Sequence, residues 1–276
     1  IDEYAFSNCT SLADITIPGS VKNIERYAFV GCTSLTSVKL VEGLESIGYG
    51  AFKNCSSLTS ITIPDSVTNI GYQAFKDCSS LTSLNFGEGL ERIGKYAFAS
   101  TGLTSLIIPG NVKNISSNAF DHCRNMVTVS FENGLETIDE FAFNSCSSLQ
   151  SITIPESVTG MGSGAFWYCT ALTEITFLGF SAPNFLKGEQ NRTEAFFQVV
   201  NANAKVFYLP GATGFGNTFG GVTTEQLADT DSDGVADIFD IFPEDPNEVA
   251  DTDGDGVGDN TDAFPEDPNE VADTDG

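Results

Sequence analysis

An Ala-Phe pair recurs through the first 170 residues of the chain at an almost constant spacing. Its alanines are Ala5, Ala28, Ala51, Ala74, Ala97, Ala119, Ala142 and Ala165, so successive pairs lie 23 residues apart, with one interval of 22. A fixed period of this length is typical of solenoids, in which each coil buries its apolar face only against its neighbours. The repeat therefore predicts a stack of coils.

Each coil is predicted to contain one short strand and one tight helical turn. Residues 58–63 (LTSITI) are rich in β-branched residues, alternate between apolar and polar at their end, and stop at Pro64, as strands do. The segment from Ala51 to Cys55 has helical apolar spacing over a single turn, so we expect a one-turn helix or 3₁₀ turn there. Stacked in register, such coils predict a right-handed solenoid with short parallel strands.

The turn after the strand alternates between two forms from one coil to the next. Four coils carry Pro, as in IPDSVTNI (63–70), and three carry Gly, as in FGEGLERI (86–93). The underlying period is therefore two coils, or 46 residues. Both forms are solutions to the same turn, and the alternation by itself predicts no function.

Seven cysteines occupy one slot of the repeat, four residues after the alanine of each pair. They are Cys9, Cys32, Cys55, Cys78, Cys123, Cys146 and Cys169, and the missing member falls near Thr101, where one unit is a residue short. Because the slot faces inward in every coil, the thiols should point in parallel along the stack, which suits neither a disulfide nor a metal cluster. We expect buried, free thiols that pack as small apolar groups.

The motifs L-x-x-I-x-I-P and A-F-x-x-C, carried in whole or in part by eight consecutive units, resemble the BspA-type leucine-rich repeat of bacterial surface proteins. The resemblance covers about residues 1–178 and implies a leucine-rich-repeat superhelix of about eight units, exposed at a cell surface for adhesion. Residues 179–228 break the period and are predicted to be the C-terminal cap, because terminal repeats must close an exposed core.

Charge divides the chain near Asp229. The chain carries 12 Lys+Arg against 38 Asp+Glu, a formal net charge of −26, and residues 229–276 hold 18 of these acids and no base. Nucleic acids and anionic membranes would repel such a chain. No run approaches the roughly 20 apolar residues of a transmembrane helix. Both ends of the sequence fall inside repeats, so we expect a secretion signal and an anchor to lie outside it.

Residues 229–276 repeat a calcium-loop pattern. DTDSDGVADIFD (229–240) and DTDGDGVGDNTD (251–262) share the spacing D-x-D-x-D-G-x-x-D-x-x-D. Such loops place oxygen ligands at positions 1, 3, 5, 9 and 12, a backbone carbonyl at 7 and a turn glycine at 6. The predicted ligands are Asp229, Asp231, Asp233, Val235, Asp237 and Asp240, then Asp251, Asp253, Asp255, Val257, Asp259 and Asp262, with Asp273 and Asp275 beginning a third loop.

The segment FPEDPNEVA follows each loop and makes residues 229–276 resemble thrombospondin type 3 repeats. This resemblance implies a mostly irregular, calcium-bound stalk. Without calcium the carboxylates would repel one another, so we expect calcium to supply the folding energy. Mg²⁺ is less suited to a crowded site of protein oxygens, and weak calcium loops are typical of extracellular modules. The alternative is a solvated, disordered acidic tail.

Outward strand positions predict a flat face rich in hydroxyl groups. The candidate binding residues are Thr59, Thr62, Thr82, Asn85, Thr104, Thr128, Ser130, Thr153 and Thr176. Solenoids bind extended partners on such faces, and hydroxyls suit polar protein or glycan surfaces. The alternative is that threonine simply suits an exposed parallel strand.

Signals of catalysis are sparse. The single histidine, His122, occupies a variable slot of the repeat, so no Ser-His-Asp arrangement is predicted. We therefore predict a non-enzymatic, secreted or cell-surface adhesion protein with calcium as its cofactor and a protein or glycan as its partner. A passive surface-layer or spacer protein without a ligand, an ice-binding protein and, weakest, a glycan-active enzyme remain open.

Overall fold

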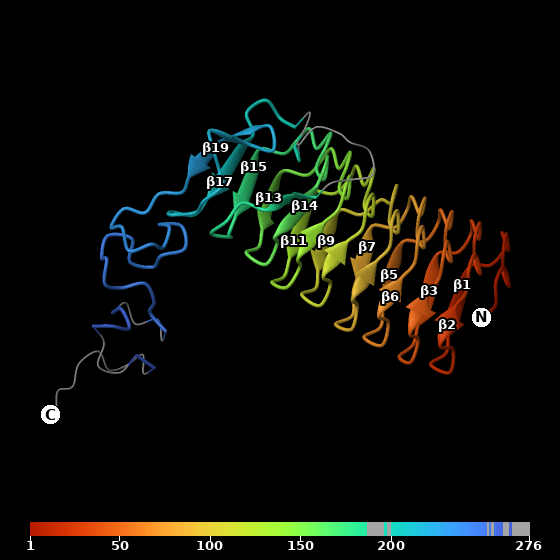
Figure 1. The fold of residues 1–276 in the computed structure, drawn as a ribbon. Coiled ribbons are helices and arrows are strands. Elements are labelled where there is room, and N and C mark those ends of the chain that lie inside the picture. Colours follow the sequence, from red (N-terminus) through yellow and green to blue (C-terminus); the bar gives the residue numbers. More distant parts are fainter. Residues whose placement is uncertain (187–195, 198–199, 253, 255–256, 262–264, 267–276) are drawn as a thin grey trace.

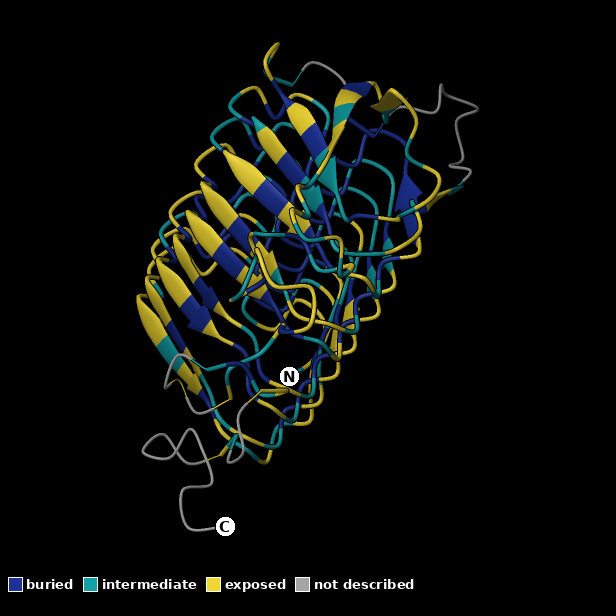
Figure 2. Ribbon diagram, turned by 90° about the vertical axis from the view of Figure 1, so that its left-hand side faces the viewer, coloured by how far each residue is buried: buried dark blue, intermediate teal, exposed yellow. Residues whose placement is uncertain are grey.

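Short strands stack into a parallel ladder along the solenoid (Figure 1). The computed structural model describes residues 1–186, 196–197, 200–252, 254, 257–261 and 265–266. The strands of this first ladder are β1 (Asp14–Ile17), β3 (Ser37–Leu40), β5 (Ser60–Thr62), β7 (Ser83–Asn85), β9 (Ser105–Ile108), β11 (Thr128–Phe131), β13 (Ser151–Ile154), β15 (Glu174–Phe177), β17 (Lys205–Tyr208) and β19 (Val222–Gln226). Their residues alternate between exposed and buried (Figure 2). The structure thus confirms the parallel solenoid.

A second parallel ladder of very short strands runs through eight coils without interruption. It consists of β2 (Asn23–Ile24), β4 (Ser46–Ile47), β6 (Asn69–Ile70), β8 (Arg92–Ile93), β10 (Asn114–Ile115), β12 (Thr137–Ile138), β14 (Gly160–Gly162) and β16 (Asn184–Leu186). The sequence does not predict this ladder, because two residues are too few to carry a strand pattern.

The helical turns predicted after each Ala-Phe pair are wrong: the described residues contain no helix, and hence none long and apolar enough to cross a membrane. Gly50 and Asn54 instead have φ angles of +57° and +61°. A left-handed residue at every fourth position prevents a right-handed helix. The turn leaves Phe52 N–H free to donate to the Ala74 carbonyl at 2.7 Å, and Asn54 N–H to the Lys76 carbonyl at 2.9 Å. Bonds that a helix would use internally therefore join neighbouring coils.

One continuous apolar core runs through the coils. The ring of Phe52 is stacked between those of Phe29 and Phe75, with centroids 5.0 and 5.2 Å apart. All seven cysteines are free, and six are buried. Cys9 is exposed, contrary to the predicted burial.

Strand pairing in the first ladder alternates with the two-coil period. β1 pairs with β3, β9 with β11 and β13 with β15 over four residue pairs each, and β5 with β7 over three. In contrast, β3 and β5 share one residue pair, and the junctions β7–β9 and β11–β13 share none. At the weakly paired β3–β5 junction the turns are joined instead, because Ser66 Oγ accepts a hydrogen bond from Gly43 N–H at 2.9 Å and donates to the Leu44 carbonyl at 2.7 Å. Turn bonds thus stabilise a junction where the strands pair poorly.

The first ladder extends beyond residue 178. β15 pairs with β17 and β17 with β19, and the two-residue β18 (Thr218–Phe219) pairs antiparallel with β19. The boundaries predicted at residues 178 and 228 stay predictions. Within 229–276 the described residues form neither strand nor helix, and this acidic segment follows β19 at the end of the stack (Figure 1). The predicted ligands Asp253, Asp255, Asp262, Asp273 and Asp275 lie outside the described residues.

Candidate functional site

The nine residues predicted to form a binding surface lie along the first ladder, on what we call the strand face. Eight of them are exposed and Thr176 is half-buried. Thr59 and Thr82 lie just before their strands, and their hydroxyls donate to the backbone carbonyls of Thr36 and Thr59, both at 3.4 Å. These two hydroxyls therefore help to hold the coils together. Threonine at this position has a structural reason that needs no ligand.

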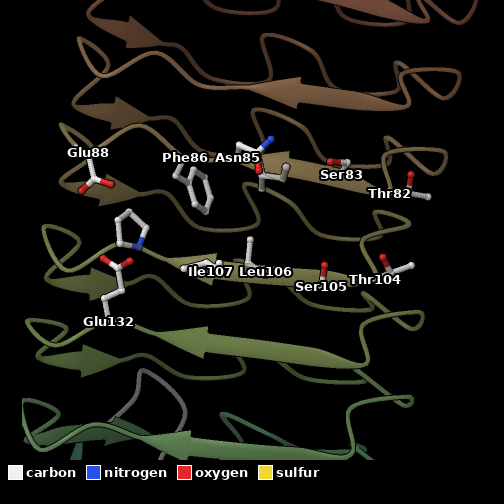
Figure 3. Close-up of a pocket in the computed structure, with 12 residues that line it drawn as sticks. Thr82, Ser83, Asn85, Phe86, Glu88, Thr104, Ser105, Leu106, Ile107 and Glu132 are labelled. Atoms are coloured by element: carbon white, nitrogen blue, oxygen red, sulfur yellow. The ribbon is translucent and has the colours of Figure 1, made fainter. Parts of the chain in front are cut away.

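A hollow interrupts the strand face between β7 and β9 (Figure 3). Its volume is about 530 Å³, and its lining includes Thr82, Asn85 and Thr104. It coincides with a coil junction at which the strands do not pair. Hydroxyl side chains occupy one end of the hollow, and the carboxylates of Glu88 and Glu132 lie at the other. The hollow therefore offers both hydrogen-bonding groups and negative charge.

A second, smaller hollow lies between β11 and β13. Its volume is about 250 Å³, and Thr128, Ser130 and Thr153 are among its lining residues. Strands lie roughly 5 Å apart in a sheet, so the two hollows are roughly 10 Å apart along the stack. Six of the nine predicted residues thus line one hollow or the other. Each hollow lies between a coil with the Gly form of the turn and the following coil with the Pro form.

Among the residues that line the first hollow, Glu88, Ile107 and Glu132 were not predicted from the sequence. Ile107 is 61% exposed, and it occupies the outward position of β9 that corresponds to Thr62 in β5 and Asn85 in β7. An apolar residue in a polar row is a signal that the sequence does contain. The two glutamates come from turns, and only the stacking of coils brings them beside the strands.

The first calcium loop gathers three of its predicted ligands. The carboxylates of Asp229, Asp231 and Asp233 lie within 4.8 Å of one another. One oxygen of each is buried without a hydrogen-bond partner, as is Oδ2 of Asp240. Loss of hydration, followed by the repulsion of the neighbouring carboxylates, raises the pKa of Asp231. Buried anionic oxygens without donors are costly, so this donor set fits a cation that prefers oxygen ligands, such as calcium.

The predicted ligands at position 9 have partners within their own loops. Asp237 accepts hydrogen bonds from the N–H and the hydroxyl of Thr230, both at 2.7 Å. Asp259 accepts the same two bonds from Thr252, at 2.7 and 2.6 Å. These bonds lower the pKa of both aspartates. Position 9 therefore closes each loop, and its role as a calcium ligand stays a prediction.

Two acids of the described acidic segment are almost fully buried. Asp240 is 9% exposed and Glu248 is 2% exposed. Asp240 Oδ1 accepts a hydrogen bond from Phe242 N–H at 2.9 Å, and Glu248 Oε2 accepts one from Asn260 N–H at 3.0 Å. The second oxygen of each carboxylate has no partner. Glu248 stands outside the D-x-D-x-D pattern, so the sequence pattern did not predict it.

The slot of His122 is defined by its backbone conformation. His122 has a φ of +60°, close to the +61° of Asn54 and the +62° of Asp77 in the same slot. Asparagine, aspartate and histidine are the non-glycine residues that most often tolerate this region. The imidazole Nδ1 lies 2.6 Å from Asp121 Oδ1. The position therefore has a structural explanation that involves no catalysis.

Known proteins of similar structure share the solenoid fold. A leucine-rich repeat protein from Bacteroides ovatus, solved by crystallography, is 24% identical with a TM-score of 0.57, over 87% of this chain and 67% of that one. A leucine-rich repeat protein from T. pallidum is 28% identical with a TM-score of 0.54, over 58% of this chain and 78% of that one. A search of curated proteins found no match.

A family model of the BspA type leucine-rich repeat region matches the chain in six copies, over residues 1–127 and 91–184. These matches span the coils that carry the Ala-Phe pairs and both hollows of the strand face. They cover well over half of the sequence. The chain therefore belongs to the BspA-type leucine-rich repeat family.

Proposed function

We propose that this chain is a non-enzymatic adhesion protein that acts outside the cell. The strand face contacts a protein or glycan partner, and residues 229–276 form a stalk that calcium stabilises. The observation that carries the proposal is the hollowed, hydroxyl-rich strand face on a stack of tightly packed coils. Membership of the BspA-type family, whose proteins are often found at cell surfaces, supports the location.

The chemistry of the strand face supports a polar, extended partner. The side chains of Thr62, Asn85 and Thr153 are exposed and make no hydrogen bond to a described residue. The backbone that carries them is fixed by paired strands, so binding would have to order only the side chains. Glycan hydroxyls and peptide groups both donate and accept hydrogen bonds, which complements such a surface.

The first loop supports the calcium part of the proposal. Four carboxylates there present buried oxygens without donors, and calcium binds six to eight such oxygens. Asp229, Asp231, Asp233 and Asp240 would hold the ion, and calcium would neutralise their mutual repulsion. Binding would then order the segment, because the ligands are brought together only in the folded loop.

A binding screen tests the adhesion proposal. The full chain, immobilised, is exposed to arrays of extracellular-matrix proteins and glycans in millimolar calcium and again with a chelator. We expect saturable binding to at least one class of partner. No binding by the calcium-loaded chain would contradict the proposal and favour a passive spacer. Thermal hysteresis of ice growth, without binding on the arrays, would favour the ice-binding alternative.

A calcium titration tests the stalk separately. We expect calorimetry on the full chain to detect calcium binding, with a change in circular dichroism that follows occupancy. The variant Asp231→Asn should weaken binding, because it removes one charge from the cluster of three carboxylates. A featureless titration up to millimolar calcium would contradict this part of the proposal.

A further inference from the structure

A carboxylate outside the calcium-loop pattern lies against the second loop. Glu248, from the segment that joins the two loops, is 2% exposed. Its Oε2 accepts a hydrogen bond from Asn260 N–H, inside the second loop, at 3.0 Å. Its Oε1 is buried and has no hydrogen-bond partner. A buried carboxylate oxygen in this position is costly unless a cation lies beside it.

We propose that Glu248 is a calcium ligand of the second loop, supplied from outside the twelve residues of that loop. This inference rests on the proposed calcium binding by residues 229–276. Asp251 and Asp259 are the described carboxylates of the ligand set predicted for that loop, and Glu248 would add a further oxygen donor to them. The ion would then tie the joining segment to the loop that follows it.

The two repeats differ at the positions that make this contact possible. A Cβ atom built on Gly258, at position 8 of the second loop, would lie 2.1 Å from Glu248 Oε2. Position 8 of the first loop is Ala236, which is buried, and the residue 22 positions before Glu248 is Gln226, which is exposed. The repeat with the inward carboxylate therefore has the glycine that makes room for it. The repeat with alanine has no carboxylate to accommodate.

This difference has a consequence for calcium affinity. Affinity in calcium loops rises with the number of charged ligands and the rigidity of the site. Glu248 gives the second loop a carboxylate that the first loop lacks, because Gln226 carries no charge. The second loop should therefore be the tighter of the two sites. Its occupancy should also stiffen the segment between the loops.

The test compares Glu248→Gln with Glu244→Gln in the full chain, by calorimetric titration with CaCl₂. Both variants remove one charge from the same segment, but Glu244 is exposed. We expect Glu248→Gln to weaken the tighter site by roughly tenfold or more, a loss typical of altered metal coordination, and Glu244→Gln to leave both sites unchanged. Gly258→Ala should weaken the same site, because the added methyl group displaces the Glu248 carboxylate. Calcium should also protect the segment between the loops from limited proteolysis in the unaltered chain and in Glu244→Gln, but less so in Glu248→Gln and Gly258→Ala.

The titrations distinguish calcium binding by residues 229–276 from the specific role of Glu248 as a ligand. If the unaltered chain binds no calcium, the calcium-bound stalk is wrong. If the chain binds calcium and Glu248→Gln behaves like Glu244→Gln, the stalk stands and Glu248 is not a ligand.

Discussion

The Sγ atom of Cys55 donates a hydrogen bond to the backbone carbonyl of Phe29 in the preceding coil, at 3.2 Å. The same bond recurs in every other coil with a buried cysteine, at 3.0 to 3.4 Å, for Cys32, Cys78, Cys123, Cys146 and Cys169. The thiols are therefore more than small apolar groups. Each one is a second donor to a carbonyl that also accepts a bond within its own coil, as the Phe29 carbonyl does from Cys32 N–H at 3.3 Å.

Replacing Cys55 with alanine should destabilise the solenoid. The variant leaves the Phe29 carbonyl without this donor and opens a small void at a fully buried position. We expect a loss of about 1–2 kcal/mol in the free energy of unfolding, measured by urea denaturation. Cys9→Ala is the matched control, because Cys9 is exposed. Equal stability of the two variants would show that the buried thiol bond contributes nothing.

Stability should fall as the pH rises above about 9. Burial raises the pKa of Cys55 to about 12 and that of Cys123 to about 12, from an ordinary value of 9.0. The unfolded chain therefore releases these protons at a lower pH than the folded chain, and the stability present below pH 9 is lost progressively towards pH 12. Melting temperatures at pH 8, 9 and 10 should fall less steeply in Cys55→Ala. Identical slopes would contradict the shift.

The left-handed turn predicts which residues the slot before each cysteine accepts. Asn54 has a φ of +61°, where a β-branched residue is strained. We expect Asn54→Val to cost about 1–2 kcal/mol, while Asn54→Gly should be neutral or slightly stabilising. Thr68→Val, at an exposed site, controls for the added apolar surface. A right-handed helical turn at this site would reverse the order of the glycine and valine variants.

The alternating strand pairs should be visible in hydrogen exchange. β9 pairs with β11 but not with β7, whereas β15 pairs with β13 on one edge and β17 on the other. Amides of residues 105–108 should therefore exchange faster than those of 174–177, measured by mass spectrometry of peptic fragments. Similar protection of the two strands would mean that the β7–β9 junction is closed by strand pairing in solution.

Much of the fold follows from the period of the sequence. The constant slots of Leu58, Ile61 and Ile63 predict the strand and its buried side, and all three are buried. The turn at Asn54 could not be predicted as left-handed from apolar spacing, because one helical turn and one such turn place Phe52 and Cys55 alike. The preference of that slot for Asn, Asp, Gly and Ser was the only local signal.

The candidate sites were less predictable, because they depend on approaches between coils or loops. Glu88 and Glu132 meet the same hollow only after a complete coil has been stacked between their turns. Glu248 reaches the second loop only because Gly258 has no side chain. The D-x-D-x-D spacing did place three carboxylates within 4.8 Å of one another in the first loop. Local spacing therefore predicts ligands within a loop, but not those that come from outside it.

The most direct test of the account asks whether the strand face is the surface that binds. The variant Asn85→Arg with Ile107→Arg places two bulky cations in the larger hollow, at exposed positions. Thr68→Arg with Thr159→Arg adds the same charge at exposed sites just before the second ladder. On the protein and glycan arrays, we expect the first variant to lose the binding of the unaltered chain and the second to retain it. Equal binding by both variants would contradict the claim that the hollowed strand face is the binding surface.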